Sequence, residues 1–209
     1  MISVRQQNFL LRKEKILAMA ETLLLDNNQD ITLSELATEL DIAKGTIYKH
    51  FKSKNQLYLE LIILNEKRLL ELSKKYNPNI QAYVSQYMLY NMLNSNRTIL
   101  LHVIEERLTN NERKLKDLFE ELYQIREERI LEIRDLFANH LKALNSTMSI
   151  RDYLSYIWTV TYGASLLLNS THYQKSIGSR ERLIKLYVKQ ALMTPDKLSE
   201  SNENIETQA

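Results

Sequence analysis

Apolar residues recur along most of this 209-residue chain every three or four positions, a spacing that places them on one face of a helix. Asn77-Pro78 breaks the pattern, because the residue before a proline disfavours helix. Thr32, with Glu35 three residues later, has the pattern of a capping box, which opens a helix. We predict an all-α chain with helices over residues 9–26, 33–40, 43–50, 54–72, 79–94, 97–108, 111–144, 150–170 and 179–193.

The composition favours helices over sheets and removes several classes of site. The chain has three Gly and two Pro, whereas sheets need many tight turns that favour these residues. It has no Cys, which excludes disulfides, thiolate zinc sites and cysteine nucleophiles. The Gly residues lie far apart, which excludes a glycine-rich phosphate loop. His102, Glu105 and Glu106 have the spacing of metal ligands on a helix, but such sets are common on charged helices. We therefore predict no catalytic site, metal or cofactor.

The formal net charge is only +2, but the charges are unevenly distributed. Residues 42–54 contain four Lys and no acid, and residues 1–15 contain four basic residues against Glu14. Basic patches close together in sequence are typical of a phosphate-binding surface, and a solvated helix face is the alternative. The polar, acidic segment 195–209 is predicted to be disordered.

The sequence also gives an expectation about location. The first fifteen residues lack the apolar run of a signal peptide. The longest apolar stretch, residues 157–168, is too short and too interrupted to span a membrane. We expect a cytoplasmic protein without membrane contact.

Two short helices around the turn Asp41-Ile42 predict a helix-turn-helix, whose second helix enters the major groove of DNA. Ile47 and Phe51 lie four residues apart and can face the core together. Three polar side chains are then left pointing outward: Thr46, Lys49 and His50. Lys, Thr and His side chains can hydrogen-bond to base edges or phosphates. Gly45 has no side chain and allows a close approach to the duplex.

Residues 32–54 resemble the helix-turn-helix of the TetR family of bacterial transcriptional regulators. The family pattern, small–any–Gly–any–aliphatic–Tyr–any–His–Phe–any–Ser/Asn–Lys, is matched from Ala43 to Lys54, and Leu57 follows where the family has Leu. Two positions depart from it, because the turn usually has Gly in place of Asp41 and the next helix usually begins at Ser or Thr in place of Ala43. The resemblance implies a homodimeric DNA-binding regulator, most often a repressor, that binds a palindromic operator through residues 43–50.

The resemblance also implies roles for individual residues. Thr32 would offer its hydroxyl and its backbone amide to a phosphate at a helix N-terminus. Tyr48 and His50 would contact the sugar-phosphate backbone, and Lys54 would contact a phosphate. The residues that would face the groove and set sequence preference are Lys44, Gly45, Thr46 and Lys49.

The resemblance further implies a division of the chain. Residues 1–53 would form the DNA-binding domain, and residues 54–194 a helical domain for effector binding and dimerisation. The helices near 150–170 and 179–193 would pair with a second subunit. The small residues Gly163, Ala164 and Ser165 agree with close helix packing, although the ordinary core of a monomer is the alternative.

Aromatic residues in this second region predict a pocket for an apolar or aromatic small molecule. Tyr83, Tyr87 and Tyr90 share one helical face. Such side chains can line an apolar pocket with a few polar tips, and plain core is the alternative. The candidate pocket residues are Tyr83, Tyr87, Tyr90, His102, Tyr123, Trp158 and Tyr162, with Arg107 as a further polar group. A helical protein-interaction module that does not read DNA is the second functional hypothesis, and an enzyme is the third.

Overall fold

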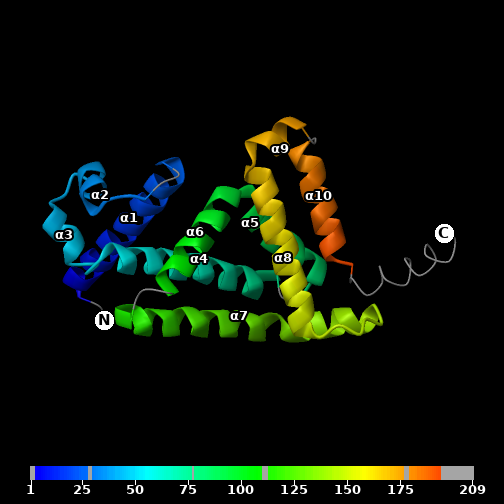
Figure 1. Ribbon diagram of the computed structural model, residues 1–209. Helices are drawn as coiled ribbons and strands as arrows, with labels where there is room; N and C mark the ends of the chain where they lie inside the picture. The colour runs from blue at the N-terminus through cyan, green and yellow to red at the C-terminus, as the bar shows by residue number, and fades with distance from the viewer. Residues whose placement is uncertain (1–2, 28–29, 77, 110–112, 177–178, 194–209) are drawn as a thin grey trace. The chain divides into compact units, whose positions relative to one another are not determined.

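The computed structural model describes residues 3–27, 30–76, 78–109, 113–176 and 179–193. This part of the chain is helical and contains no strand, which confirms the all-α prediction (Figure 1). The elements are α1 (Val4–Asn27), α2 (Leu33–Glu39), α3 (Lys44–Tyr48), α4 (Lys54–Tyr76), α5 (Ile80–Leu93), α6 (Ser95–Thr109), η1 (Arg113–Leu115, a 3-10 turn), α7 (Lys116–Ala143), α8 (Ile150–Asn169), α9 (Thr171–Ser176) and α10 (Arg180–Ala191). The acidic segment 195–209, predicted to be disordered, lies outside the described residues.

Several helix boundaries differ from the sequence expectation; α4, for example, continues to Tyr76 rather than ending near residue 72. α1 begins at Val4 rather than near residue 9, because Ser3 and Gln6 cap it. The Gln6 amide donates to Ser3 Oγ at 3.2 Å, and the Ser3 amide donates to Gln6 Oε1 at 3.0 Å. The short helix α9, which was not predicted, follows α8 after Ser170. Capping side chains and a single turn of helix carry little hydrophobic periodicity, so the pattern could not reveal them.

The chain divides into two compact units. Unit 1 comprises Met1–Glu66 and Leu100–Tyr123, and unit 2 comprises Lys67–Ile99 and Gln124–Ala209. The division therefore falls inside α4, α6 and α7. The boundary expected at residues 53–54 refers to function and stays a prediction.

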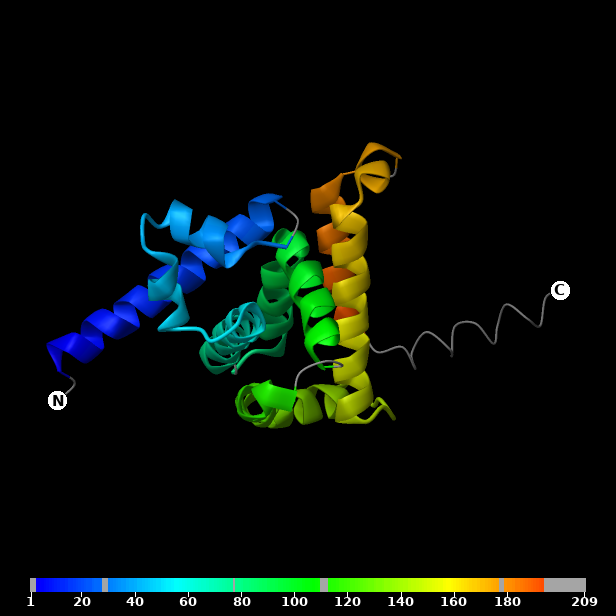
Figure 2. The ribbon, with the colours of Figure 1, turned by 60° about the vertical axis from the view of Figure 1, so that its left-hand side comes forward.

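Unit 1 is built around α1, α2 and α3, which Figures 1 and 2 show lying side by side. Its core includes these buried aliphatic and aromatic side chains: Ile16, Ala20, Leu24, Ile31, Leu36, Ile47, Phe51, Leu57 and Tyr58. The first apolar positions of α1 behave differently from the sequence pattern, since Phe9 and Leu10 are nearly half exposed. The buried face of α1 therefore starts near Ile16 and leaves the first three turns at the surface.

Unit 2 packs α5, α8 and α10 together, and α8 and α10 lie side by side in Figure 2. Its core is rich in aromatic rings, with the Tyr83 and Phe137 centroids 5.8 Å apart and the Phe137 and Tyr153 centroids 5.6 Å apart. The buried Tyr153 hydroxyl donates to the Ala191 carbonyl at 2.7 Å. This hydrogen bond ties the start of α8 to the end of α10.

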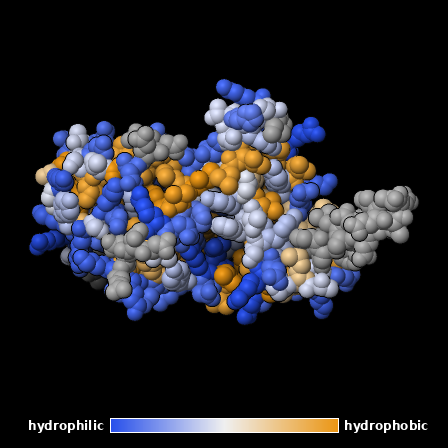
Figure 3. Space-filling model, in the orientation of Figure 1, coloured by the Kyte–Doolittle hydropathy of each residue, from blue (hydrophilic) through white to orange (hydrophobic). Residues whose placement is uncertain are grey.

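Hydrophobic side chains also reach the surface. Figure 3 shows hydrophobic patches between hydrophilic ones on the face it presents. On α8 and α10 the exposed apolar residues are Trp158, Leu166, Leu167 and Leu186. Within the described residues, no helix is long and apolar enough to cross a membrane.

Candidate nucleic-acid interface

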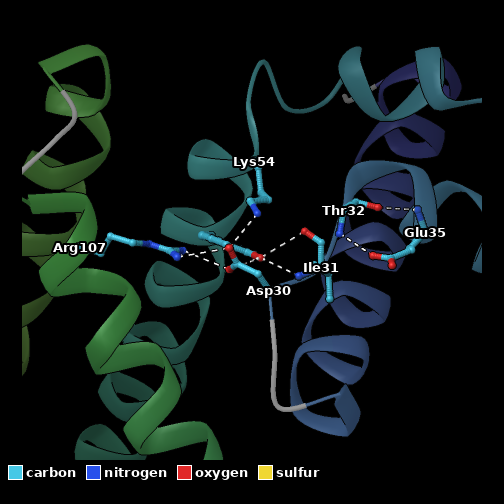
Figure 4. A network of polar contacts seen from close by, with 7 residues as sticks. Asp30, Ile31, Thr32, Glu35, Lys54 and Arg107 are labelled. Atoms are coloured by element: carbon cyan, nitrogen blue, oxygen red, sulfur yellow. Dashed lines mark hydrogen bonds and ion pairs between the residues drawn. The ribbon is translucent and has the colours of Figure 1, made fainter.

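The first short helix of the predicted helix-turn-helix, α2, is opened by a complete capping box (Figure 4). The Glu35 amide donates to Thr32 Oγ1 at 3.1 Å, and the Thr32 amide donates to Glu35 Oε2 at 2.7 Å. The Thr32 amide, which donates to the carboxylate, and after it the Thr32 side chain hold the pKa of Glu35 below its usual value. The Thr32 amide, expected to bind a phosphate, is therefore occupied by a carboxylate.

The turn between α2 and α3 accommodates both departures from the family pattern. Asp41 has φ 51°, in the left-handed region where Gly is usual and where Asp is better tolerated than most residues. Ala43 stands at the N-cap of α3 and makes no side-chain capping hydrogen bond. Missing caps cost about 1 kcal/mol, which does not prevent α3 from forming here.

Burial on the second helix, α3, confirms the predicted inner positions, whereas of the three side chains expected to point outward only Lys49 is exposed, and Thr46 and His50 are half-buried. Ile47 and Phe51 are fully buried. The outer residues Lys44, Gly45 and Lys49 are exposed, Tyr48 is 48% exposed, and Thr46 is half-buried. A Cβ built on Gly45 would meet no atom within 4 Å. The space beside Gly45 is therefore available to a partner.

The ammonium groups on this face are available for a partner as well. Lys44, Lys49 and Lys52 are exposed and have no ion pair with any described residue. Lys13 differs, because its ammonium pairs with Glu60 and lies over the Phe51 ring, 5.6 Å from the centroid. The α3 region thus presents cations that the fold itself does not use.

His50 is half-buried and packs its ring against Phe9 of α1, with centroids 4.1 Å apart. Burial, together with the charges of Arg12 and Lys13, lowers the pKa of His50. The imidazole is therefore neutral at pH 7, and its Nδ1 has no hydrogen-bond partner among the described residues. Because this Nδ1 is buried, it is not available to a ligand, and the neutral imidazole does not add a full positive charge to this face.

Lys54, expected to contact a phosphate, belongs to a polar cluster centred on Asp30 (Figure 4). Its Nζ lies 3.0 Å from Asp30 Oδ2, and Arg107 Nη1 and Nη2 each lie 3.3 Å from an Asp30 oxygen. The Tyr58 hydroxyl donates to Asp30 Oδ1 at 3.1 Å and accepts from the Ile31 amide at 3.1 Å. A phosphate would therefore compete with Asp30 for Lys54.

The cluster shifts the ionisation of its members. Burial raises the pKa of Asp30, but the hydrogen bonds and charges of Lys54 and Arg107 outweigh this and bring it below its ordinary value. Burial also raises the pKa of Tyr58 to about 12.

From the sequence alone, Arg107 is placed in the effector pocket, whereas its described contacts are with Asp30 and the Tyr58 ring. Asp30 and Arg107 are 77 positions apart, and no local spacing could have paired them.

The structure brings together three of the residues predicted for an effector pocket. Tyr83, Tyr87 and Trp158 line a cavity of about 240 Å³ in unit 2, together with Phe137 and Arg129. Tyr83 and Tyr87 are also buried in the core of unit 2, whereas Trp158 is 46% exposed. Other members of the predicted set do not line this cavity: Tyr90, His102, Tyr123 and Tyr162. His102 and Tyr123 belong to unit 1, and Tyr162 stacks on Trp158 with centroids 5.2 Å apart.

Unit 1 contains a helix-turn-helix domain, as the capping box, the tight turn and the buried and exposed sides of α3 show. Residues 16–61 match the family model described as "Bacterial regulatory proteins, tetR family". The domain is therefore a TetR-family helix-turn-helix, as the sequence predicted.

Two characterised regulators are similar to part of this chain. The HTH-type transcriptional regulator QacR of Staphylococcus aureus (strain Mu50 / ATCC 700699) is 33% identical over 82 residues, which cover 39% of this chain and 44% of the relative. The HTH-type transcriptional regulator AcrR of Shigella flexneri is 32% identical over 84 residues, which cover 40% of this chain and 35% of the relative. The matches thus span less than half the length of either relative.

Proposed function

We propose that this protein is a homodimeric transcriptional repressor that binds a palindromic DNA operator and releases it when a small molecule binds. The observation that carries the proposal is the outer face of α3. It presents Lys44, Gly45 and Lys49 to solvent while Ile47 and Phe51 anchor the helix in the core. Such a short helix, braced by α2, fits the major groove through its first residues.

The DNA contacts divide between bases and backbone. Lys44, Thr46 and Lys49 read base edges, and Gly45 lets the helix approach closely. Tyr48, half exposed beside them, and the neutral His50 hydrogen-bond to the sugar-phosphate backbone. Thr32 adds its hydroxyl, and Lys54 reaches a phosphate by exchanging its contact with Asp30.

Dimerisation through α8 and α10 is supported by their exposed apolar residues. Trp158, Leu166 and Leu167 on α8 and Leu186 on α10 stay at the surface of the single chain. A Cβ added to Gly163, on the same helix as the first three, would meet no atom within 4 Å. Burial of such side chains against a second copy supplies about 25 cal/mol per Å² of apolar surface.

The cavity in unit 2 supports an aromatic effector. Three aromatic side chains, Tyr83, Tyr87 and Trp158, supply flat walls, and Arg129 supplies a cation 5.8 Å from the Tyr87 ring centroid. A volume of about 240 Å³ is small for a ligand site and suits a molecule of about one ring. Binding there shifts the DNA equilibrium only by its different affinity for the two states, about 1–3 kcal/mol in typical cases.

The proposal is tested by recovering genomic fragments from the source organism with the purified protein at about 50 and 200 mM salt. We expect one or a few palindromic sites to remain enriched at the higher salt. The Lys49→Ala and Tyr48→Ala variants should lose this enrichment, whereas Lys116→Ala, an exposed base on α7, should keep it. If binding disappears at the higher salt and the fragments share no site, the regulator hypothesis is refuted. The alternative, a protein-interaction module, then remains.

A further inference from the structure

The first three turns of α1 lie outside the segment that carries the family match. The match begins at residue 16, whereas α1 begins at Val4. These turns border a groove of about 870 Å³ whose other side is formed by the end of α3 and the residues after it. The groove residues that matter here are Arg5, Phe9 and Arg12 from α1, and Thr46, Lys49 and His50 from the α3 region.

The stack of Phe9 on His50 fixes the position of α1 beside α3. The ring centroids are 4.1 Å apart and the ring planes are inclined by 28°. Phe9 is 46% exposed, so this contact covers one part of the ring and leaves another facing solvent. A ligand that lies along the outer face of α3 can therefore also contact the first turns of α1.

The charge on this groove is of one sign. Its lining includes Arg5, Arg12 and Lys49 and no Asp or Glu. Arg5 and Arg12 are seven positions apart and share a helix face. Neither guanidinium has an ion pair or hydrogen bond with any described residue, whereas the adjacent Lys13 is paired with Glu60. Lys13 is therefore ion-paired within the chain, whereas the guanidinium groups of the two arginines are available to a partner.

We propose that the first three turns of α1 form a second DNA-binding element, which holds the sugar-phosphate backbone that flanks the base pairs read by α3. Arg5 and Arg12 bind phosphates, and the exposed edges of Phe9 and Leu10 pack against deoxyribose. The inference rests on the proposed function, because α3 supplies one wall of the groove. Charge complementarity and continuity with the α3 face favour DNA over a protein partner, which would have to supply acidic groups.

The test uses the duplex that the wild-type protein selects, made in two lengths. One ends at the base pairs protected by α3, and the other extends about six base pairs further on each side, roughly 20 Å of helix. Binding is measured by fluorescence anisotropy over a salt series. The double variant Arg5→Gln/Arg12→Gln is compared with Lys15→Gln, which removes an exposed charge from α1 outside the groove.

We expect the double variant to bind the extended duplex roughly tenfold more weakly than wild type, with a salt slope lower by about 0.9 for each lost phosphate contact. On the short duplex it should match Lys15→Gln, and Arg5→Lys/Arg12→Lys should restore most of the affinity for the extended one. A loss no larger than that of Lys15→Gln, or an equal loss on both duplexes, would overturn the inference. Failure of the wild-type protein to select any duplex would instead refute the proposed function.

Discussion

The two units place their functional groups in different ways. In unit 1 the outer residues of α3 follow one another within a few positions, and two buried neighbours, Ile47 and Phe51, fix which side faces out. In unit 2 the cavity takes Tyr83 and Tyr87 from α5, Arg129 from α7 and Trp158 from α8. A local motif can therefore be read from sequence, whereas an assembled cavity depends on packing between distant helices.

The largest expected effect is a difference in stability between variants of the two phenylalanines that pack beside α3. Phe51 is fully buried, and Phe51→Ala should lower the free energy of unfolding by about 3–5 kcal/mol. Phe9, nearly half exposed, is the matched control, and Phe9→Ala should cost about 1 kcal/mol or less. Urea denaturation followed by circular dichroism measures both. Equal losses would contradict the assignment of Phe51 to the core and Phe9 to the surface.

In unit 2 the corresponding test concerns a buried hydrogen bond. Tyr153→Phe removes the hydroxyl that donates to the Ala191 carbonyl at 2.7 Å, and a buried carbonyl left without a partner costs about 1–3 kcal/mol. Tyr156 makes a similar bond to the Gln190 carbonyl at 3.3 Å but is only half-buried. Tyr156→Phe should cost less, because water can replace its hydroxyl. Thermal unfolding of the two variants side by side measures the difference. A larger loss of stability in Tyr156→Phe than in Tyr153→Phe would contradict the prediction.

A smaller, pH-dependent effect is expected from Asp30. Lys54 and Arg107 lower the pKa of Asp30 in the folded protein. The contribution of Asp30 to the free energy of unfolding is therefore complete above the unfolded pKa of about 4, and it is lost as the pH falls through the lower pKa of the folded state. Because the carboxylate is about half exposed, the contribution is about 1 kcal/mol or less.

Asp30→Asn should therefore be less stable than wild type at neutral pH, and the difference should shrink in acid. Urea denaturation at about pH 7 and about pH 3 provides the comparison. Glu181→Gln, in an exposed pair with Lys185, is the control and should change little at either pH. A difference that persists unchanged at the lower pH would exclude ionised Asp30 as its source.

The smallest effect is expected from His50. Its pKa is lowered in the folded protein, so the unfolded chain takes up the proton first and stability falls as the pH drops below about 6.5. Below the folded pKa the loss stops growing. Melting temperatures of wild type and His50→Gln between about pH 7.5 and 5.5 should show a shallower fall for the variant. Parallel curves would mean that His50 titrates alike in both states.

The sequence predicted the fold and the α3 face because both depend on spacings of three or four residues. It correctly placed Ile47 and Phe51 inside and Lys49 outside. It did not predict the contact between Asp30 and Arg107, which joins two segments 77 positions apart. It also did not predict that Phe9 and Leu10 stay nearly half exposed, because a periodicity cannot tell where a buried face gives way to a surface groove.

The hydrogen bond from the Ile31 amide to the Tyr58 hydroxyl gives this protein a natural spectroscopic reporter. Most protected amides in a helical protein are held by carbonyls of their own helix and report only on that helix. The Ile31 amide lies in the segment before α2 and is held by a side chain of α4 at 3.1 Å. Its rate of exchange with deuterated water therefore follows the separation of these two segments, and one resonance can record whether DNA or an effector loosens them.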